Sequence, residues 1–262
     1  MAARLARAAV AFFLVCAALV SARPAIAQAR QANPPIWSYS GANGPDHWSD
    51  LDPAFAACKT GQRQSPINIV GAQAAELAPI QFNYTLAPLK IINNGFTIQI
   101  NYEPGSSIAA NGVVLPLVQF HFHHASENQI NGQKYDMELH LVHMDPVSNR
   151  AAVVAVFIKS GAENAPLRDL WKYIPRDKGK EEEHKKVLIN PADLLPADQN
   201  YYVFDGSFSI PPCKENVTWY VLKTPIEASP AQIAAFARYY SDNARPLQSA
   251  NGREIRESNF QK

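Results

Sequence analysis

The segment from Leu117 to His143, LVQFHFHHASENQINGQKYDMELHLVH, holds five of the seven histidines of the chain. Side chains alternate between the two faces of a β-strand, so QFHFH places His121 and His123 together on one face. The dipeptide Asn131-Gly132 lies between QFHFH and MELHLVH and is typical of the tight turn of a β-hairpin. We therefore expect two antiparallel strands that bring His140 beside His121 and His123.

Three imidazoles that converge from a rigid sheet can bind a metal ion. Neutral ring nitrogens suit zinc, and three protein ligands leave a fourth position open for water, as in catalytic rather than structural zinc sites. The alternative is that these histidines are unrelated polar residues on a solvated strand face. It is disfavoured because the opposite faces of both strands carry bulky apolar residues, such as Phe120, Phe122 and Leu139, so that the sheet must be packed.

The segment resembles the alpha-class carbonic anhydrases, for which QFHFH and ELHLVH at this separation are specific features. The resemblance continues through further motifs and covers nearly all of the chain from about Pro35 onward. These motifs are SGANGPDHW (Ser40 to Trp48), QSPINI (Gln64 to Ile69), INNG (Ile92 to Gly95), GSFSIPPC (Gly206 to Cys213), TWYVLK (Thr218 to Lys223) and NARPLQ (Asn243 to Gln248). The resemblance implies a sheet of about ten strands. It also implies an enzyme that reversibly hydrates carbon dioxide to bicarbonate and a proton.

By this resemblance, His121, His123 and His140 bind zinc, and zinc-bound hydroxide attacks the carbon of carbon dioxide. Groups next to these ligands are expected to fix the orientation of the rings. They are the side chain of Gln119 for His121, the side chain of Glu138 for His140 and the backbone carbonyl of Asn243 for His123.

Ser209 stands where the family usually has a threonine whose hydroxyl aligns the hydroxide, and Glu127 is expected to accept the hydrogen of that hydroxyl. Serine keeps the donor and the acceptor but is freer at χ1, which predicts a small penalty. The alternative is that Ser209 is merely a turn residue. The expected wall of the pocket for the small apolar substrate is Val142, Val153, Phe208 and Trp219, each of which taken alone would be ordinary core.

Three positions depart from the family pattern. Phe96 occupies the place of a proton-shuttling histidine, and phenylalanine cannot carry a proton. His124 and His184 are the only loose substitutes, and His124 is expected to point away from the ligand face. Asn128 replaces a usual histidine and Phe204 a usual tyrosine, two residues that the family links in one buried network. We expect slow proton transfer from the change at Phe96. From the changes at Asn128 and Phe204 we expect lower stability or slightly weaker zinc binding, with the site intact.

The N-terminus is typical of a secretory signal peptide. Arg4 and Arg7 form a basic region, Ala8 to Val20 is apolar, and Ala25-Ile26-Ala27 fits a cleavage site. This predicts a signal peptide over residues 1–27 and a single catalytic domain over residues 28–262. The apolar run is short for a bilayer span, so an uncleaved anchor helix is the less favoured alternative. We expect a periplasmic or secreted protein with no membrane insertion after cleavage.

Charge and cysteine content narrow the expected partners and compartment. Without residues 1–27 the chain has 21 basic and 23 acidic residues, a formal charge of −2. This charge does not favour binding to nucleic acid or to an anionic membrane. The expected partners are carbon dioxide and bicarbonate, and a homodimer is left open. Two cysteines remain, Cys58 and Cys213, either as one disulfide or as two buried thiols. The resemblance implies the disulfide, which would constrain the unfolded chain by ~4 to 5 kcal/mol.

Short runs rich in Ile, Val, Phe and Tyr alternate with turn residues along much of the chain, a pattern typical of β-strands. The expected strands are Ile80–Tyr84, Leu89–Asn93, Phe96–Tyr102, Gly112–Pro116, Leu117–His123, Tyr135–His143, Ala151–Lys159, Asn200–Phe204 and Thr218–Leu222. Helices are expected at Ala165–Ile174, at Glu181–Ile189, where glutamates and lysines four residues apart can pair, and after Ser229-Pro230. The expected fold class is mainly β (α+β): a single domain around a large central, mostly antiparallel twisted sheet with peripheral short helices.

Two other functions stay open at this point. One is a non-catalytic binding module of the same fold, against which the complete set of three histidines argues. The other is a side activity on esters by the same zinc-hydroxide. The chain contains neither HExxH nor Gly-x-Ser-x-Gly, which would favour a dedicated hydrolase.

Overall fold

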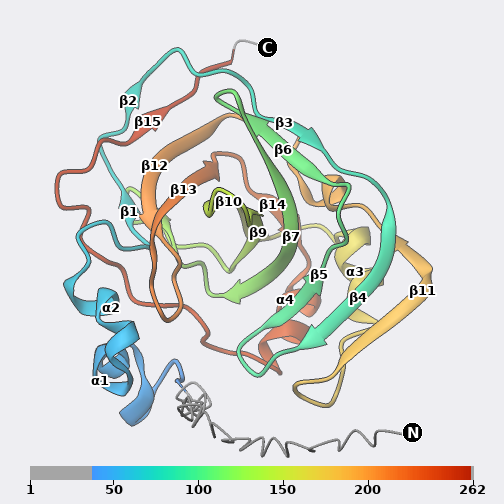
Figure 1. Ribbon diagram of the computed structural model, residues 1–262. Helices are drawn as coiled ribbons and strands as arrows, with labels where there is room; N and C mark the ends of the chain where they lie inside the picture. The colour runs from blue at the N-terminus through green and yellow to red at the C-terminus, as the bar shows by residue number, and fades with distance from the viewer. Residues whose placement is uncertain (1–36, 261–262) are drawn as a thin grey trace, which may run out of the picture. The chain divides into compact units, whose positions relative to one another are not determined.

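A sheet of thirteen strands dominates the computed structural model, which describes residues 37–260 (Figure 1). Ten strands follow one another in the order β11-β4-β5-β7-β9-β10-β13-β12-β15-β2, while β3 and β6 attach beside β7 and β14 beside β10. The bounds are β2 Gln73–Ala74, β3 Gln81–Asn83, β4 Ala87–Asn93, β5 Ile98–Asn101, β6 Ser107–Ala110, β7 Val113–His124, β9 Met137–Asp145, β10 Arg150–Ser160, β11 Glu181–Ile189, β12 Tyr201–Ser207, β13 Glu215–Leu222, β14 Ile226–Ala228 and β15 Arg256–Glu257. Strands β1 (Asn68–Ile69) and β8 (Gln129–Ile130) form a separate parallel pair.

Most neighbouring strands of the large sheet are antiparallel, which confirms the expected fold class. The exceptions are the parallel pairs β10–β13, β10–β14 and β15–β2. Each of the nine expected strands overlaps a strand of the structure, and Gly112–Pro116 and Leu117–His123 belong to one continuous strand, β7. The parallel β10–β13 pair at the centre joins segments far apart in the sequence, so local patterns give no signal for it.

The central strands are buried on both faces, so each face of the sheet that carries the histidines is covered by packed side chains. On one face, Phe120 and Phe122 of β7 lie in a large cluster with Leu139 and Leu141 of β9. On the other face, a second cluster includes Trp219 of β13 and neighbouring side chains of β9 and β10. Near-continuous apolar runs are typical of strands covered on both sides. The sheet is therefore a rigid support for side chains at the end of β7 and β9.

Two short helices cover the Phe122 face of the sheet (Figure 1). They are α3 (Ala165–Trp171) and α4 (Pro230–Ala237), both of which were predicted. Ser229 caps α4 through a capping box with Gln232, as its position before Pro230 indicated. The ring of Phe122 contacts Trp171 at 4.8 Å between centroids, so α3 packs directly behind the histidine strand.

The predicted helix over Glu181–Ile189 is wrong, because these residues form strand β11. The strand pairs with β4 at the edge of the sheet, as Figure 1 shows. The charges four residues apart suggested a helix, but Lys185 lies 3.9 Å from Glu183, on the same strand face, and not beside Glu181. The open edge of β4 supplied backbone hydrogen bonds that outweighed local helix propensity. Glutamates and lysines on an edge strand also discourage pairing with another chain.

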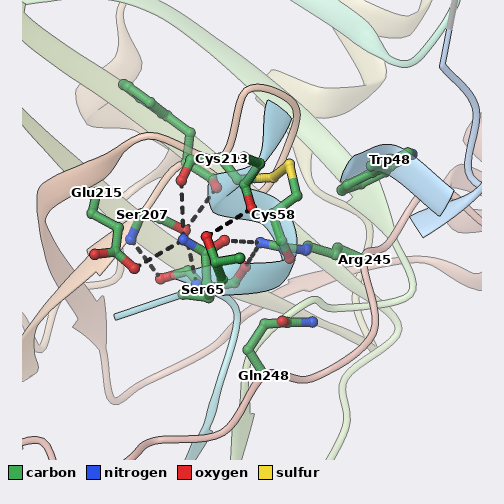
Figure 2. Close-up of a disulfide and its surroundings, with 12 residues drawn as sticks. Trp48, Cys58, Ser65, Ser207, Cys213, Glu215, Arg245 and Gln248 are labelled. Carbon is green, nitrogen blue, oxygen red and sulfur yellow. Dashed lines mark hydrogen bonds between the residues drawn. A yellow bond between two sulfur atoms is a disulfide. The ribbon is translucent and has the colours of Figure 1, made fainter. Parts of the chain in front are cut away.

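The described chain begins with a segment of short helical turns that packs around a disulfide. These turns include α1 (Trp48–Leu51) and α2 (Ala57–Thr60). Cys58 of α2 is bonded to Cys213, which confirms the expected bridge (Figure 2). The predicted signal peptide, residues 1–27, lies outside the described residues, as does the start of the predicted mature chain. Within residues 37–260, none of the helices has the length and apolar character needed to cross a membrane.

Candidate metal centre

The three histidines meet because of the register between β7 and β9. His121 lies directly opposite His140 in this antiparallel pair, and His123 lies opposite Glu138. The ring centroids are 5.0 Å apart for His121 and His123, 5.3 Å for His121 and His140, and 4.5 Å for His123 and His140. Each ring offers one nitrogen, and these nitrogens all lie within 4.8 Å of one another. The turn at Asn131-Gly132 forms as expected, although the connection it belongs to also carries β8.

A hydrogen bond occupies the second nitrogen of each ring. Nδ1 of His121 lies 2.8 Å from Oε1 of Gln119, and Nδ1 of His123 lies 2.7 Å from the backbone carbonyl of Asn243. Nε2 of His140 lies 3.0 Å from Oε1 of Glu138. A carbonyl or carboxylate oxygen can only accept, so each ring carries its hydrogen at that nitrogen. The lone pairs are left on Nε2 of His121, Nε2 of His123 and Nδ1 of His140.

The surroundings keep all three rings neutral. Burial is the largest cause that lowers the pKa of His121, His123 and His140 below its usual value, and repulsion between the rings adds to it for His121 and His140. Nε2 of His123 is buried and has no hydrogen-bond partner in the described part of the chain. A buried polar atom without a partner is costly, and a cation among three lone pairs would remove that cost. The donor set, three neutral imidazole nitrogens, fits zinc.

Glu138 is fully buried and is held by Asn128. The backbone N–H of Asn128 donates to Oε2 of Glu138 at 2.8 Å, and its side-chain amide donates to Oε1 at 2.7 Å. Burial raises the pKa of Glu138, and these two hydrogen bonds act against that rise. The side-chain oxygen of Asn128 accepts from the backbone N–H of Ile67 at 3.1 Å. Asn128 therefore supports Glu138 without a tyrosine, and Phe204 lies with its ring parallel to Trp219 instead.

Glu127 lies behind the histidines, next to Ser209. Its Oε1 accepts a hydrogen bond from the backbone N–H of Arg245 at 2.8 Å. Burial raises the pKa of Glu127 to about 8, while the Arg245 N–H and the side chain of Ser209 act in the opposite direction. Oε1 of Glu127 lies 3.6 Å from Nδ1 of His123, and Oε2 lies 3.9 Å from Nδ1 of His140. The structure thus brings Glu127 and Ser209 to the same end of the sheet as the three histidines.

Comparison with known proteins gives the same family from sequence and from structure. The family model for eukaryotic-type carbonic anhydrase matches residues 43–259. The chain belongs to this carbonic anhydrase family. A carbonic anhydrase of Nostoc sp. is 42% identical over 227 residues, which cover 85% of this chain and 86% of the relative. A carbonic anhydrase of Klebsiella pneumoniae is 41% identical, covering 84% and 89% of the two chains. The alpha-carbonic anhydrase of Thermovibrio ammonificans, solved with the inhibitor sulfanilamide, superposes with a TM-score of 0.82 at 39% identity, covering 85% and 99%.

The residues expected to form the carbonic anhydrase substrate pocket lie beside His140. Val142, Val153 and Trp219 are buried in one cluster, and Phe208 is half-buried against it. The ring of Trp219 stands nearly perpendicular to that of His140, with centroids 4.9 Å apart. The Nε1–H of Trp219 donates to the backbone carbonyl of Ser207, which holds the ring in place. The histidines therefore have an apolar side formed by β9, β10 and β13.

Neither histidine offered as a substitute for the carbonic anhydrase shuttle lies on the ligand face. Phe96 stacks on Trp37, with centroids 3.9 Å apart and planes at 8°. His124 follows His123 in β7 and so points to the other side, where its Nδ1 bonds the backbone carbonyl of Ser241. His184 on β11 pairs with Leu89, whose side chain lies in the Phe120 cluster on the opposite face of the sheet.

Arg245 is a structural residue of the centre that the sequence analysis did not identify. Its buried guanidinium donates to Oε1 of Gln64, to the carbonyl of Ser65 and to the carbonyl of Cys58, at 2.9, 2.7 and 2.9 Å (Figure 2). Its backbone N–H holds Glu127. One residue thus connects the disulfide-bearing segment to the acid behind the histidines. Its presence in the NARPLQ motif was the only available signal, because an arginine in sequence is usually exposed.

Proposed function

We propose that the chain catalyses the reversible hydration of carbon dioxide to bicarbonate and a proton, at a zinc ion held by His121, His123 and His140. The observation that carries this proposal is the convergence of three lone pairs, each fixed by a hydrogen bond at the other nitrogen of its ring. Three protein ligands leave one position for water, which is the arrangement of catalytic zinc. The complete ligand set argues against a binding module of the same fold.

Zinc bound there supplies Lewis acidity that lowers the pKa of a coordinated water, as is established for enzymes of this class. The protein contributes orientation. Glu127 has one oxygen committed to the Arg245 N–H. A cation at the three histidines would favour the ionised form of Glu127, whose other oxygen can then accept the hydrogen of the Ser209 hydroxyl. The Ser209 oxygen then presents a lone pair to the attacking oxygen and fixes its direction.

Carbon dioxide is small and apolar, and the wall of Val142, Val153, Phe208 and Trp219 suits it. Such a wall attracts the substrate by dispersion and offers few groups that would hold competing water. The hydroxyl of Ser209 and the carboxylate of Glu127 are the polar groups at the edge of this wall. We infer that the substrate lies against the wall with its carbon facing the attacking oxygen. The same site could act slowly on activated esters, as a side activity.

The released proton has to reach the solvent, and neither candidate histidine lies on the ligand face to carry it. Phe96 cannot accept a proton, and His124 and His184 point away from the centre. We propose that buffer molecules collect the proton directly. Turnover is then limited by buffer concentration and not by the attack on carbon dioxide.

We also propose that residues 1–27 are a signal peptide and that residues 28–262 act outside the cytoplasm, in the periplasm or beyond. The Cys58–Cys213 disulfide supports export, because structural disulfides form in oxidising compartments. Mass spectrometry of the mature protein tests this directly, with Gln28 expected as the first residue.

Stopped-flow measurement of carbon dioxide hydration tests the proposed activity. The zinc-loaded protein, the metal-depleted protein and a His121→Ala variant are compared at two buffer concentrations, with zinc content measured in parallel. We expect one zinc per chain, activity that disappears with the metal and returns on adding zinc, and inhibition by sulfanilamide. A zinc-loaded protein without hydration activity would contradict the proposal and favour the binding module.

A further inference from the structure

A hollow lies on the face of the sheet away from the metal centre. Its volume is about 590 Å³, and it is lined by β6, β7, β10, β12, β13 and the segment 253–256. On β13, Trp219 faces the histidines, whereas its neighbours Thr218 and Tyr220 line this hollow. None of the three histidines and none of their hydrogen-bonding partners lines it. We call it the arginine groove, after Arg63, Arg150, Arg253 and Arg256.

The floor of the arginine groove is apolar. Ile108, Leu115, Ala152 and Val203 form it, and each is less than a tenth exposed. At one side of this floor stands the phenol of Tyr220, whose pKa is raised to about 12 by burial. A hydrogen bond with the side chain of Asn111, which also lines the groove, acts against that rise. Because that bond favours the ionised phenol, the Tyr220 oxygen accepts it, and the O–H remains as a donor for a ligand. A floor of this kind favours a ligand with an apolar body and one polar group.

The rim of the groove carries an excess of positive charge. Four arginines and two carboxylates, Asp205 and Glu254, line it, so its formal charge is +2. Arg63 lies 4.0 Å from Asp205, and Arg256 lies 3.8 Å from Glu254, both longer than a hydrogen bond and largely in solvent. These two guanidiniums are therefore only loosely held by their acidic neighbours.

The other two arginines differ in what they hold. The guanidinium of Arg253 donates four hydrogen bonds to backbone carbonyls and is a fixed part of the wall. In the described part of the chain, the guanidinium of Arg150 makes no hydrogen bond and no ion pair within 4 Å, and it lies at the start of β10 near the floor residue Ala152. Asp145 lies opposite Arg150 on β9, but its carboxylate accepts hydrogen bonds from Val147 and Ser148. A guanidinium is planar and presents paired donors that match a carboxylate.

We propose that the arginine groove binds a small organic anion with an apolar body, such as an aryl carboxylate. Arg150 holds the carboxylate at the rim, Arg256 adds positive charge from β15, Tyr220 donates to a second polar group, and the apolar body lies on the floor. The volume falls within the range of ligand pockets and is far larger than bicarbonate would fill. The site is separate from the metal centre, so the proposal does not depend on the proposed catalytic activity.

Isothermal titration of the zinc-loaded full chain with 2-naphthoate tests the proposal. We expect saturable binding at one site, weakened about tenfold by Arg150→Gln, which loses a charge-assisted contact. The double variant with Arg256→Gln should bind more weakly still, because the rim loses a second positive charge. Tyr220→Phe keeps the ring and should weaken binding several-fold. Arg168→Gln serves as the matched control, because Arg168 is an exposed arginine on α3 that does not line the groove; it should bind as the unmodified chain does.

A crystal soaked with 6-bromo-2-naphthoate locates the ligand by the anomalous signal of bromine. A peak over the groove floor supports the proposal, as does its loss in the double variant. A peak only at the histidines, or equal affinity of the double variant and the unmodified chain, would overturn it. The proposal would also be overturned if a second copy of the chain covered the groove in solution and excluded 2-naphthoate.

Discussion

Phe96 is the residue that we expect to limit the proposed reaction most, because it stands at the chain position of the family's proton-shuttling histidine and carries no titratable group. We predict that Phe96→His raises the turnover number at low buffer on the order of tenfold, since an imidazole can relay protons near neutral pH. The specificity constant should change little, because it reports the attack on carbon dioxide. Stopped-flow assays across a range of buffer concentrations measure both.

A Phe96→Ala variant is the matched control for Phe96→His. It also removes the stacking on Trp37 but supplies no proton carrier. If the alanine variant gains as much turnover as the histidine variant, the aromatic bulk and not proton transfer is limiting, and the shuttle argument fails.

Ser209 supports a second prediction at the level of one residue. Ser209→Ala should lower the turnover number on the order of a hundredfold, because the hydroxyl that fixes the attacking oxygen is lost. Ser209→Thr should match or modestly exceed the native enzyme, since the added methyl restricts χ1. Steady-state hydration rates at saturating buffer decide between these outcomes. An alanine variant with native rates would show that Ser209 is only a turn residue.

For single residues, the sequence predicted the hydrogen-bond partners of the three histidines but not the contacts of Arg245. The partners of the three rings, Gln119, Glu138 and Asn243, lie within hydrogen-bond distance of the rings that they were expected to hold. Two of them follow from strand alternation, because residues two apart share a face. The role of Arg245 could not be predicted, because burial of its guanidinium depends on the side-chain oxygen of Gln64 and on two backbone carbonyls, all from residues more than a hundred positions away.

Among the elements, β7 and β9 were the most predictable, and β11 the least. Alternating histidines and phenylalanines identify a strand with two different faces, and the register then follows from the need to bury both phenylalanines. In Glu181–Ile189 the charges fit a helix as well as an edge strand, and only the unpaired edge of β4 decides between them. The central pairing of β10 with β13 is likewise set by tertiary packing and not by either segment alone.

The side chain of Asn128 is hydrogen-bonded both to Glu138 of β9 and to Ile67, the residue before β1, so its replacement should affect how these elements are held together. Asn128→His should cost about 1–3 kcal/mol of unfolding free energy, because the backbone N–H of Ile67 loses its acceptor. Phe204→Tyr added to it should recover part of that cost by supplying a partner for the new imidazole. Urea unfolding of the two single variants and the double variant gives the coupling energy, and a coupling of zero would contradict this account.

For the whole molecule, His143 predicts how stability depends on pH. It is buried on the face away from the metal centre, where its Nε2 meets the hydroxyl of Tyr84 at 2.9 Å, and burial lowers its pKa to about 3. The unfolded chain takes up this proton near pH 6.5, so the neutral ring favours the folded state fully only above that value. Stability should fall by up to about 1.4 kcal/mol per pH unit as pH drops from 6.5 toward 3.

The contribution of His143 is isolated by comparing Tyr84→Phe with Tyr84→Phe/His143→Phe, since both lack the phenol. Urea unfolding at pH 5 and pH 7 should show a smaller pH dependence in the double variant. Identical pH dependence in the two proteins would mean that His143 is not the group responsible.

The two faces of the sheet carry different sites. One face holds the histidines with an apolar wall, and the other holds the larger core and the arginine groove. This division follows from strand alternation, which assigns neighbouring residues of β13 to different faces. The sequence therefore predicts that two environments exist, while their contents depend on which strands the fold places side by side.

A crystal of the zinc-loaded protein, measured at the zinc absorption edge, tests the central claim most directly. We predict one anomalous peak between Nε2 of His121, Nε2 of His123 and Nδ1 of His140, with a single remaining position filled by water and not by a protein atom. A peak elsewhere, a ligand atom on the other nitrogen of any ring, or a protein side chain in the fourth position would contradict it.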